Sequence, residues 1–429
     1  MIDARRDGLY LVAVGALIFV LFGATMQFAA RESLADFRAI YFPAKTLVHG
    51  RDPFNAIETM RIYRAEGLFR EHYSSKDLEI ATVNVYPPST LFLVAPLALL
   101  PSRIAAVLWA ILTFTVVVIA SLLMWELSVP YSPLLAGALI GLVLLNGILL
   151  AVTGNVAGIA IGASAIGVWC FVRERFVFWG ILGLALGLAL KPHDTVFVWL
   201  ALLLTGDALR RRALQSLLAA TLLSLPGIIY TWFVAPHWIQ EWNANLAVYS
   251  ARGGINDPGL LSSGGHGLDS LISLQTVFSV LKDDPRFYNA AADIVCIPLL
   301  LWWALQVLRH SQTIERTWLA LAAVAPLSLL PIYHRQVDAI LLLLAIPGCA
   351  VVQSWRGFAG RASVAITAGA LTFSGIFCLA GIGGILLAGT PKLPGLGTWW
   401  TVLMEIFPAP LILLLMATFF LWQLSRQRA

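Results

Sequence analysis

The chain of 429 residues is 59% hydrophobic and only 12% charged, about half of the charged fraction that soluble domains carry. This composition leaves no soluble domain of useful size and predicts a single integral membrane domain over residues 1–429, all-α and polytopic. The formal net charge of +5 does not indicate a nucleic-acid partner, because the arginines are divided into small groups between apolar runs.

Apolar runs in chain order predict about twelve membrane-spanning helices, since one helix needs about 20 apolar residues to cross hydrocarbon. The first run follows Arg5 and Arg6 and is longer than the apolar core of a signal peptide, so we interpret it as a retained signal anchor. Two later runs, 176–190 and 193–206, are short enough to merge or to form a re-entrant pair. The predicted spans are residues 9–30, 103–126, 133–151, 155–172, 176–190, 193–206, 214–234, 291–308, 318–331, 335–353, 362–388 and 399–424.

Groups of arginines between these runs predict the orientation of the chain. If Arg5 and Arg6 hold the N-terminus in the cytoplasm, alternation places the other basic groups on the same side, as the positive-inside rule requires. Two long loops, residues 31–102 and 235–290, then face the extracytoplasmic side of the cell inner (plasma) membrane, where we expect the functional site. The basic groups are Arg173 and Arg175, Arg210 to Arg212, Arg309 and Arg316, Arg356 and Arg361, and Arg426 and Arg428.

The first long loop opens with a polar stretch, residues 31–53, whose candidate catalytic residue is Asp36. A carboxylate just outside the bilayer, followed by an aromatic-rich turn that contains Tyr41, can lie at headgroup level and accept a proton from a bound hydroxyl. The alternative is that Asp36 only caps a short interfacial helix that ends near Gly50, since Asp favours N-caps and Gly favours helix ends.

Further along both loops, the sequence predicts short or irregular elements. Tyr86-Pro87-Pro88 begins an apolar stretch that prolines interrupt up to Pro101, which indicates an interfacial or re-entrant helix. The second loop is rich in glycine, serine and proline around residues 253–266, and we expect a mobile irregular segment there, with His266 as a candidate binding residue. This segment is either a lid over a lipid-level cleft or a connector.

Glycines and cysteines inside the apolar runs receive no chemical role. Small residues spaced four apart predict seams of close helix packing, at Gly137 and Gly141, at Gly154, Gly158 and Gly162, and at Gly183 and Gly187. The cysteines have no paired spacing, so neither a disulfide framework nor a cysteine-ligated metal is expected from Cys170, Cys296, Cys349 and Cys378.

Polar residues gather in the short turns that this orientation places on the outer side. Cations at helix ends beside an uncharged interior suit the phosphate of a lipid carrier. Each residue alone has a plainer alternative: Lys191 can extend its amine to lipid headgroups, and His334 can be an interfacial histidine with satisfied hydrogen bonds. The turns are Gly154-Asn155, Lys191-Pro192-His193-Asp194, Tyr333-His334-Arg335-Gln336 with Asp338 one turn on, and Pro391-Lys392.

Motifs of other chemistries do not occur in the sequence. It has no phosphate-binding P-loop, no dinucleotide-binding glycine motif, no zinc-protease motif and no nucleophile elbow. A short Asp-x-Asp metal motif is missing as well, and the adjacent pair Asp283-Asp284 is only a weak metal candidate. We therefore predict chemistry without a bound divalent metal or other cofactor.

Together these features resemble glycosyltransferase family 87, which belongs to the GT-C superfamily of polytopic membrane enzymes. Recognisable motifs run from about residue 31 to 195 and continue as topology, with a match at His334. The family's glycine-glutamine pair appears here as Gly154-Asn155, a departure that affects the donor contacts expected there. The other matching residues are Asp36, Tyr41, Gly50, Tyr86-Pro87-Pro88, Pro96-Leu97, Pro101 and Lys191-Pro192.

The resemblance implies a GT-C fold and an α-mannosyltransferase, or a relative, that uses a polyprenyl-phosphate sugar as donor and a glycolipid or glycan as acceptor. Asp36 matches the family's first-loop aspartate and is expected to deprotonate the acceptor hydroxyl in a single inverting displacement. His334 matches the late-loop histidine and is expected to act on the leaving phosphate. The expected substrate-binding residues are Tyr41, Tyr86, Asn155, Lys191, His193, His266 and Arg335.

Two other functional classes stay open at this stage. A transporter or flippase of a lipid-linked sugar often has inverted repeats and ionisable residues near the bilayer midplane, and the sequence shows neither. A structural membrane subunit that binds partners through residues 235–290 predicts that loss of Asp36 is harmless.

Overall fold

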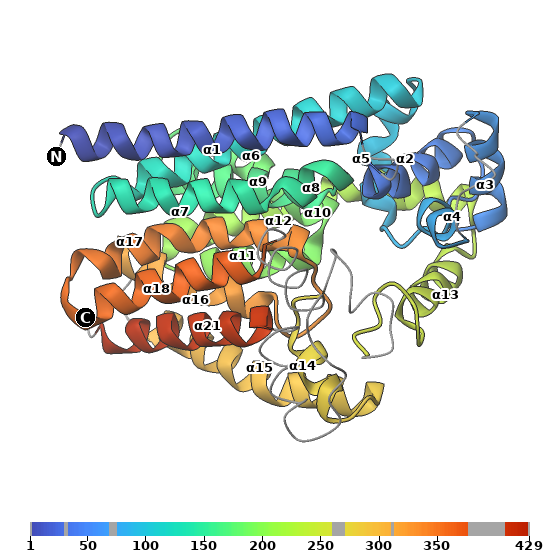
Figure 1. Cartoon of the computed structure of the whole chain (residues 1–429). Helices are drawn as coiled ribbons and strands as arrows, with labels where there is room; N and C mark the ends of the chain where they lie inside the picture. The colour runs from blue at the N-terminus through green and yellow to red at the C-terminus, as the bar shows by residue number, and fades with distance from the viewer. Residues whose placement is uncertain are drawn as a thin grey trace, which may run out of the picture.

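All regular elements in the described part of the chain are helices, and the computed structural model describes residues 2–29, 33–67, 75–259, 271–309, 313–375 and 408–427. A large group of helices runs side by side as a bundle, with both chain termini at one end (Figure 1). A smaller group, α2 to α5 with α13, lies at the opposite end (Figure 1). The prediction of an all-α chain is confirmed for these residues.

The bundle is formed by the long apolar runs of the sequence. Each of the predicted spans coincides with a helix, although the runs 362–388 and 399–424 extend beyond the described residues. The bundle helices are α1 (Ile2–Ala29), α6 (Ser102–Ser128), α7 (Pro133–Asn146), α8 (Ile148–Thr153), α9 (Ala157–Val172), α10 (Val177–Leu190), α11 (Pro192–Leu204), α12 (Asp207–Val234), α15 (Pro285–Arg309), α16 (Ile314–Ser328), the 3₁₀ helix η1 (Gln336–Ala345), α17 (Ile346–Ser354), α18 (Gly357–Phe373) and α21 (Pro408–Arg426).

Seven helical segments of the described chain are long and apolar enough to cross a membrane, which gives the protein the architecture of a multi-pass membrane protein. Among the described residues, the predicted spans 155–172, 176–190 and 193–206 do not meet this criterion, because α9, α10 and α11 are apolar but shorter. The predicted span 362–388 lies partly outside the described residues. The long segments are Asp3–Gln27, Ser102–Ser128, Pro133–Thr153, Ala208–Val234, Pro285–Arg309, Gln336–Ser354 and Pro408–Arg426.

Large apolar side chains cover the outward faces of the bundle. On α12, Leu218 and Leu222 are 62% and 60% exposed, and on α15 Ile294 is 72% exposed. Contiguous apolar patches of this kind are unfavourable in water but suit contact with lipid chains. The surface therefore supports the membrane assignment that composition suggests.

Glycines allow the bundle helices to approach closely. A Cβ on Gly137 of α7 would lie 2.2 Å from the backbone oxygen of Gly8 in α1, and a Cβ on Gly183 of α10 would lie 2.7 Å from that of Ala163 in α9. No larger residue fits at these distances without a shift of the backbone. The predicted packing seams are confirmed at Gly137 and Gly183.

The first long loop folds into four helices around a second apolar core. The central helix, α2, buries Phe37, Ile40 and Tyr41, and it ends before Gly50, whose φ of 65° suits a glycine that follows a helix. The predicted short helix and its end are confirmed. The helix after Tyr86 has 11 residues and is too short to cross a membrane, as predicted. The four helices are α2 (Ala35–Val48), α3 (Ala56–Ala65), α4 (Ser75–Thr82) and α5 (Pro88–Ala98).

The second long loop also contains two helices that the sequence did not predict, α13 (Trp238–Ser250) and α14 (Leu274–Leu281), one on each side of the predicted irregular segment. The described part of that segment, residues 253–259, has irregular backbone as predicted, and residues 260–266 lie outside the described residues. Glycine and proline confine the irregular backbone to residues after Ser250. Asp257 closes the turn that follows α13, because its carboxylate accepts hydrogen bonds from the backbone N–H groups of Gly253 at 2.8 Å and Gly259 at 2.9 Å.

Arginine side chains connect the turns at the end of the bundle where both chain termini lie. Arg212 of α12 donates to the carbonyl of Phe171 and pairs with Glu174 at 3.1 Å. Arg316 of α16 donates to the carbonyl of Leu424 at 3.2 Å, near the C-terminus. Arginine groups that the sequence assigns to one side therefore gather at one end of the fold.

Candidate functional site

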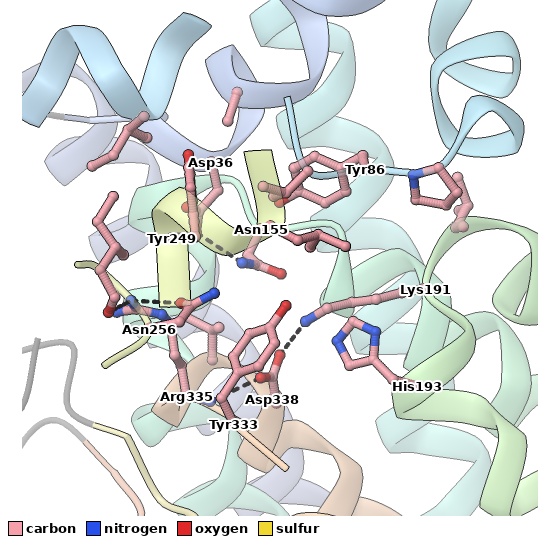
Figure 2. A pocket seen from close by; sticks show the side chains of 18 of the residues that line it. Asp36, Tyr86, Asn155, Lys191, His193, Tyr249, Asn256, Tyr333, Arg335 and Asp338 are labelled. Atoms are coloured by element: carbon pink, nitrogen blue, oxygen red, sulfur yellow. Dashed lines mark hydrogen bonds and ion pairs between the residues drawn. The ribbon is translucent and has the colours of Figure 1, made fainter. Parts of the chain in front are cut away.

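A cavity of about 310 Å³ lies where the two loops meet the ends of the bundle helices. Its wall is formed by α2, the turn before α5, α13, the turn between α10 and α11, and the turn that leads into η1. Apolar residues such as Ile80, Leu190 and Val337 complete this wall. The labelled polar side chains are Asp36, Tyr86, Asn155, Lys191, His193, Tyr249, Asn256, Tyr333, Arg335 and Asp338 (Figure 2).

Asp36 lies on the first turn of α2, at the cavity wall. The N-cap of this helix is Leu34, with a φ of 60° and no side-chain capping bond. Oδ2 of Asp36 instead accepts a hydrogen bond from Nδ2 of Asn155 at 2.8 Å (Figure 2). Asp36 is therefore not the N-cap of α2, and the hydrogen bond from Asn155 orients its carboxylate.

The Gly154-Asn155 turn positions this pair. Gly154 ends α8 with a φ of 67°, and a Cβ there would lie 3.0 Å from Cβ of Phe37, so glycine permits the close approach of α2. Oδ1 of Asn155 accepts a hydrogen bond from the backbone N–H of Ala157 at 2.9 Å. Its amide N–H group is thereby directed toward Asp36.

Lys191 is a buried cation that separates α10 from α11, where Pro192 starts the second helix. Its Nζ pairs with Asp338 and, at 3.0 Å, with Oδ2 of Asp194, while its side chain is 9% exposed. Burial alone would lower the pKa of Lys191, but the two carboxylates outweigh burial and raise this pKa above its usual range. The ammonium group therefore stays charged.

Hydrogen bonds from the first loop hold the end of α10, next to Lys191. The hydroxyls of Ser89 and Thr90 in α5 donate to the carbonyls of Ala189 and Leu190, each at 2.8 Å. These bonds satisfy carbonyls that a helix end otherwise leaves without partners. The position of Lys191 thus depends on the first loop as well as on its own helices.

Arg335 reaches the cavity from the turn that precedes η1. Its backbone N–H donates to Oδ2 of Asp338 at 2.9 Å, and its guanidinium donates to the carbonyl of Ile255 and to Oδ1 of Asn256, the latter at 3.2 Å. An antiparallel bridge pairs Arg335 with Leu271. The second loop and the late turn therefore hold this positive charge together.

Two histidines flank Asp194 next to Lys191. Nε2 of His193 and Nε2 of His334 each lie 3.4 Å from Oδ1 of Asp194. The side chain of Asp194 is fully buried and that of His334 is 1% exposed, whereas His193 lines the cavity. These three residues form a group that can hold a metal ion, with one ligand atom from each within 4.8 Å of the others.

Helix α13 forms one wall of the cavity through Trp242 and Tyr249. The indole N–H of Trp242 donates to the carbonyl of Val85 at 2.9 Å, which fixes α13 to the first loop. Burial, followed by nearby carboxylates, raises the pKa of Tyr249 and of Tyr86. Both phenols therefore stay protonated and can donate hydrogen bonds.

The cavity brings together most of the residues that the sequence predicts for the site. Tyr41 is not among them, because its ring is buried in the second core and its hydroxyl donates to the carbonyl of Leu100 at 2.7 Å. His334 lies beside His193 and is not part of the wall. His266 falls outside the described residues. The predicted residues at the wall are Asp36, Tyr86, Asn155, Lys191, His193 and Arg335.

The acidic pair Asp283-Asp284 does not form a joint site. Nη2 of Arg252 donates to Oδ2 of Asp283 at 2.7 Å, and Lys282 pairs with Asp284 at 3.0 Å. Each carboxylate is thus neutralised by a neighbouring cation, which weakens the case for a metal at this pair.

Five polar residues of the site, Asp194, Tyr249, Asn256, Tyr333 and Asp338, were missed or received no role from the sequence. Asp194 and Asp338 each follow a predicted cation by three residues, a spacing that allows an ion pair on a helical turn and could have revealed them. Tyr249 and Asn256 have no local signal, because they reach the cavity only through the packing of α13 and the turn after it.

The fold and the cavity define a multi-pass helical membrane protein with a polar site at one end of its bundle. Comparison of the chain with protein-family models, with curated proteins and with solved structures found no match. The functional assignment therefore rests on the chemistry of the cavity residues.

Proposed function

We propose that this protein is a membrane glycosyltransferase of GT-C type, related to family 87. It moves a sugar, mannose or a related hexose, from polyprenyl phosphate to a hydroxyl of a lipid or glycan acceptor. One observation carries the proposal: a single cavity brings the carboxylate of Asp36 together with the cations Lys191 and Arg335 (Figure 2). A base and fixed positive charge are what transfer from a phosphate leaving group requires.

Asp36 is the general base in this proposal. As the acceptor oxygen bonds to the anomeric carbon, Asp36 takes the hydroxyl proton, and the departing phosphate oxygen keeps the electron pair of the broken bond. A single displacement of this kind inverts the anomeric configuration. The hydrogen bond from Asn155 holds one carboxylate oxygen, Oδ2, and leaves Oδ1 for the acceptor.

Lys191 and Arg335 stabilise the leaving phosphate, whose negative charge grows as the bond breaks. Their partners fix both cations before the substrate binds, so little reorganisation is needed during the reaction. The phenols of Tyr86 and Tyr249 add hydrogen-bond donors at the wall. His334 lies off the wall and acts through His193 or Asp194 rather than by direct contact.

The reaction takes place at the extracytoplasmic face of the membrane. Support comes from the arginine groups, which lie at the end of the bundle opposite α2 to α5 and α13. The polyprenyl chain remains among the membrane lipids while its phosphate enters the cavity.

The substitution Asp36→Asn tests the base, because asparagine keeps the size and much of the hydrogen bonding but cannot accept the proton. We expect kcat to fall by at least about 100-fold, with little change in donor affinity. The measurement is single-turnover transfer from a saturating polyprenyl-phosphate sugar, with folding checked by size exclusion in detergent. Mass spectrometry of co-purifying lipids identifies the sugar.

Glu58→Gln is the matched control, since Glu58 is a carboxylate of the same loop that pairs with Arg51 and Arg61 and does not line the cavity. A well-folded Asp36→Asn protein that keeps more than about a tenth of the wild-type kcat rules out Asp36 as the base. Intact labelled donor that crosses vesicles without sugar transfer indicates a transporter instead.

A further inference from the structure

His193, Asp194 and His334 are spaced as ligands of one metal ion. Each histidine Nε2 lies 3.4 Å from Oδ1 of Asp194, which exceeds the usual hydrogen-bond range of about 2.7–3.2 Å. Zinc bonds to nitrogen and carboxylate oxygen measure about 2.0–2.1 Å, so a tetrahedral site places neighbouring ligand atoms about 3.3–3.4 Å apart. The observed spacing fits this geometry at both histidines.

Buried atoms of this group lack ordinary partners. Among the described residues, Nε2 of His334 and Oδ1 of Asp194 are buried without a hydrogen bond, whereas Oδ2 of Asp194 pairs with Lys191 at 3.0 Å. Nδ1 of His334 lies 3.2 Å from the carbonyl oxygen of Ile332, and this carbonyl can only accept a hydrogen bond. The proton of a neutral imidazole is therefore on Nδ1, and Nε2 presents its lone pair toward Asp194. A lone pair beside a buried carboxylate is unfavourable unless a cation lies between them.

Lys191 does not supply that cation. Its Nζ pairs with Asp338 and with Oδ2 of Asp194, whereas Oδ1 is the oxygen nearest both histidines. The site also has an excess of negative charge, because three carboxylates lie against two cations, namely Asp36, Asp194 and Asp338 against Lys191 and Arg335. A divalent cation reverses this balance and favours a phosphate. The charge argument rests on the proposed function, whereas the ligand geometry does not.

We propose that His193, Asp194 and His334 bind a divalent transition metal of the zinc type. Two imidazoles and one carboxylate suit zinc, and three protein ligands leave a fourth position for water or a ligand oxygen. His193 lines the cavity with 30% of its side chain exposed, so the fourth position opens on that side. The carbonyl of Ile332 orients His334 from behind, as the outer partners of metal-binding histidines do.

This site differs from the metal-free chemistry that the sequence predicts. Only His193 and Asp194 are adjacent in the chain, and an adjacent pair is not a metal motif. His334 joins them because the turn before η1 packs against the start of α11. The ligand set therefore exists only in the folded chain.

The test measures zinc binding by the full chain in detergent, without any sugar donor. Protein treated with a chelator and desalted is titrated with zinc, and the bound metal is measured by mass spectrometry. Cobalt(II) in place of zinc reports tetrahedral coordination by its visible absorption. We expect one metal ion per chain. His193→Ala and His334→Ala should each weaken binding by more than about 100-fold, since even loss of an outer partner costs about 10- to 100-fold.

His237→Ala is the matched control, because His237 is exposed at the start of α13 and is not part of the group. It should bind zinc as the wild type does. His193 is partly exposed, so His193→Ala should fold, which size exclusion verifies. Absence of zinc from the wild type, or equal binding by wild type and His193→Ala, overturns the metal site. Zinc binding with no sugar transfer supports the metal site and refutes only the proposed function.

Discussion

Charged side chains at the cavity are held by neighbours before a substrate arrives. Asn155 orients the carboxylate of Asp36, while Asp338 and Asp194 hold the ammonium of Lys191. Such preorganisation matters because groups already fixed by folding lose little further entropy when they act. The orientation of each charged group at the site therefore depends on a partner residue as well as on the group itself.

Glu241 of α13 provides a pH-dependent contact with Asp52 of the first loop. A hydrogen bond between the two side chains, then burial, raises the pKa of Glu241 from 4.5 to about 7. The folded protein therefore keeps a proton that the unfolded chain releases, and stability falls as pH rises through this window. In the wild type, the free energy of unfolding should fall by about 1 kcal/mol across this window because of Glu241, a value discounted for solvent screening. We expect Glu241→Gln to lack this fall, because glutamine does not titrate. Thermal unfolding in detergent on either side of the window measures it.

Glu58→Gln serves as the control for this effect, because Glu58 pairs with arginines and has a lowered pKa. It should leave the loss of stability between pH 4.5 and about 7 in place. An unchanged pH profile in Glu241→Gln would show that Glu241 and Asp52 share no proton.

Close packing between helices depends on glycines at the contact positions. Gly137 in α7 meets the backbone of α1 at Gly8, so neighbouring helices touch through main chain rather than through side chains. At the cavity, Gly154 allows the start of α2 to pack against the end of α8. Glycines at close helix contacts thus allow the bundle helices to pack and also position Asp36.

Gly137→Ala should destabilise the protein by about 1–3 kcal/mol, because the added Cβ would overlap the backbone oxygen of Gly8. Gly369→Ala in α18 is the control, since its Cβ would lie 3.5 Å from the end of Ile412, an ordinary contact. Alanine favours helix by up to about 1 kcal/mol over glycine, so this control should be neutral or stabilising. Equal unfolding midpoints in detergent for both variants would contradict close packing at Gly137.

The whole molecule has two chemically different ends. Both termini lie at one end of the bundle, and α2 to α5 with α13 lie at the other (Figure 1). Arg212 and Arg316 make their contacts at the end with the termini, whereas α2 and α13 form part of the cavity wall. A bundle with long apolar helices between two polar ends suits a bilayer, and the arginines favour the cytoplasmic side.

Cysteine labelling in sealed cells tests this orientation. Arg61→Cys on α3 should react with an impermeant reagent from outside, since the side chain of Arg61 is 63% exposed, whereas Arg211→Cys should react only after permeabilisation. A Cys378→Ser background limits other labelling, because Cys170, Cys296 and Cys349 are buried. Labelling of Arg211→Cys in intact cells would reverse the orientation and the assignment of the cavity to the outer face.

The sequence by itself determined the membrane class, the positions of the apolar bundle helices and most of the polar residues at the cavity, among them Asp36, Asn155, Lys191 and Arg335. These features follow from composition, from apolar run length and from alternation across a bilayer, all of which are local or strictly sequential. The proline-interrupted stretch after Tyr86 was predictable for the same reason.

Only the tertiary structure decided which of these residues meet. In the folded chain, Tyr41 lies outside the cavity, α13 forms one of its walls and His334 lies beside Asp194. It also showed that several apolar runs form helices too short to cross alone. Such outcomes depend on contacts between segments far apart in the chain, and no local pattern encodes them, because the free energy of packing is shared among many distant residues.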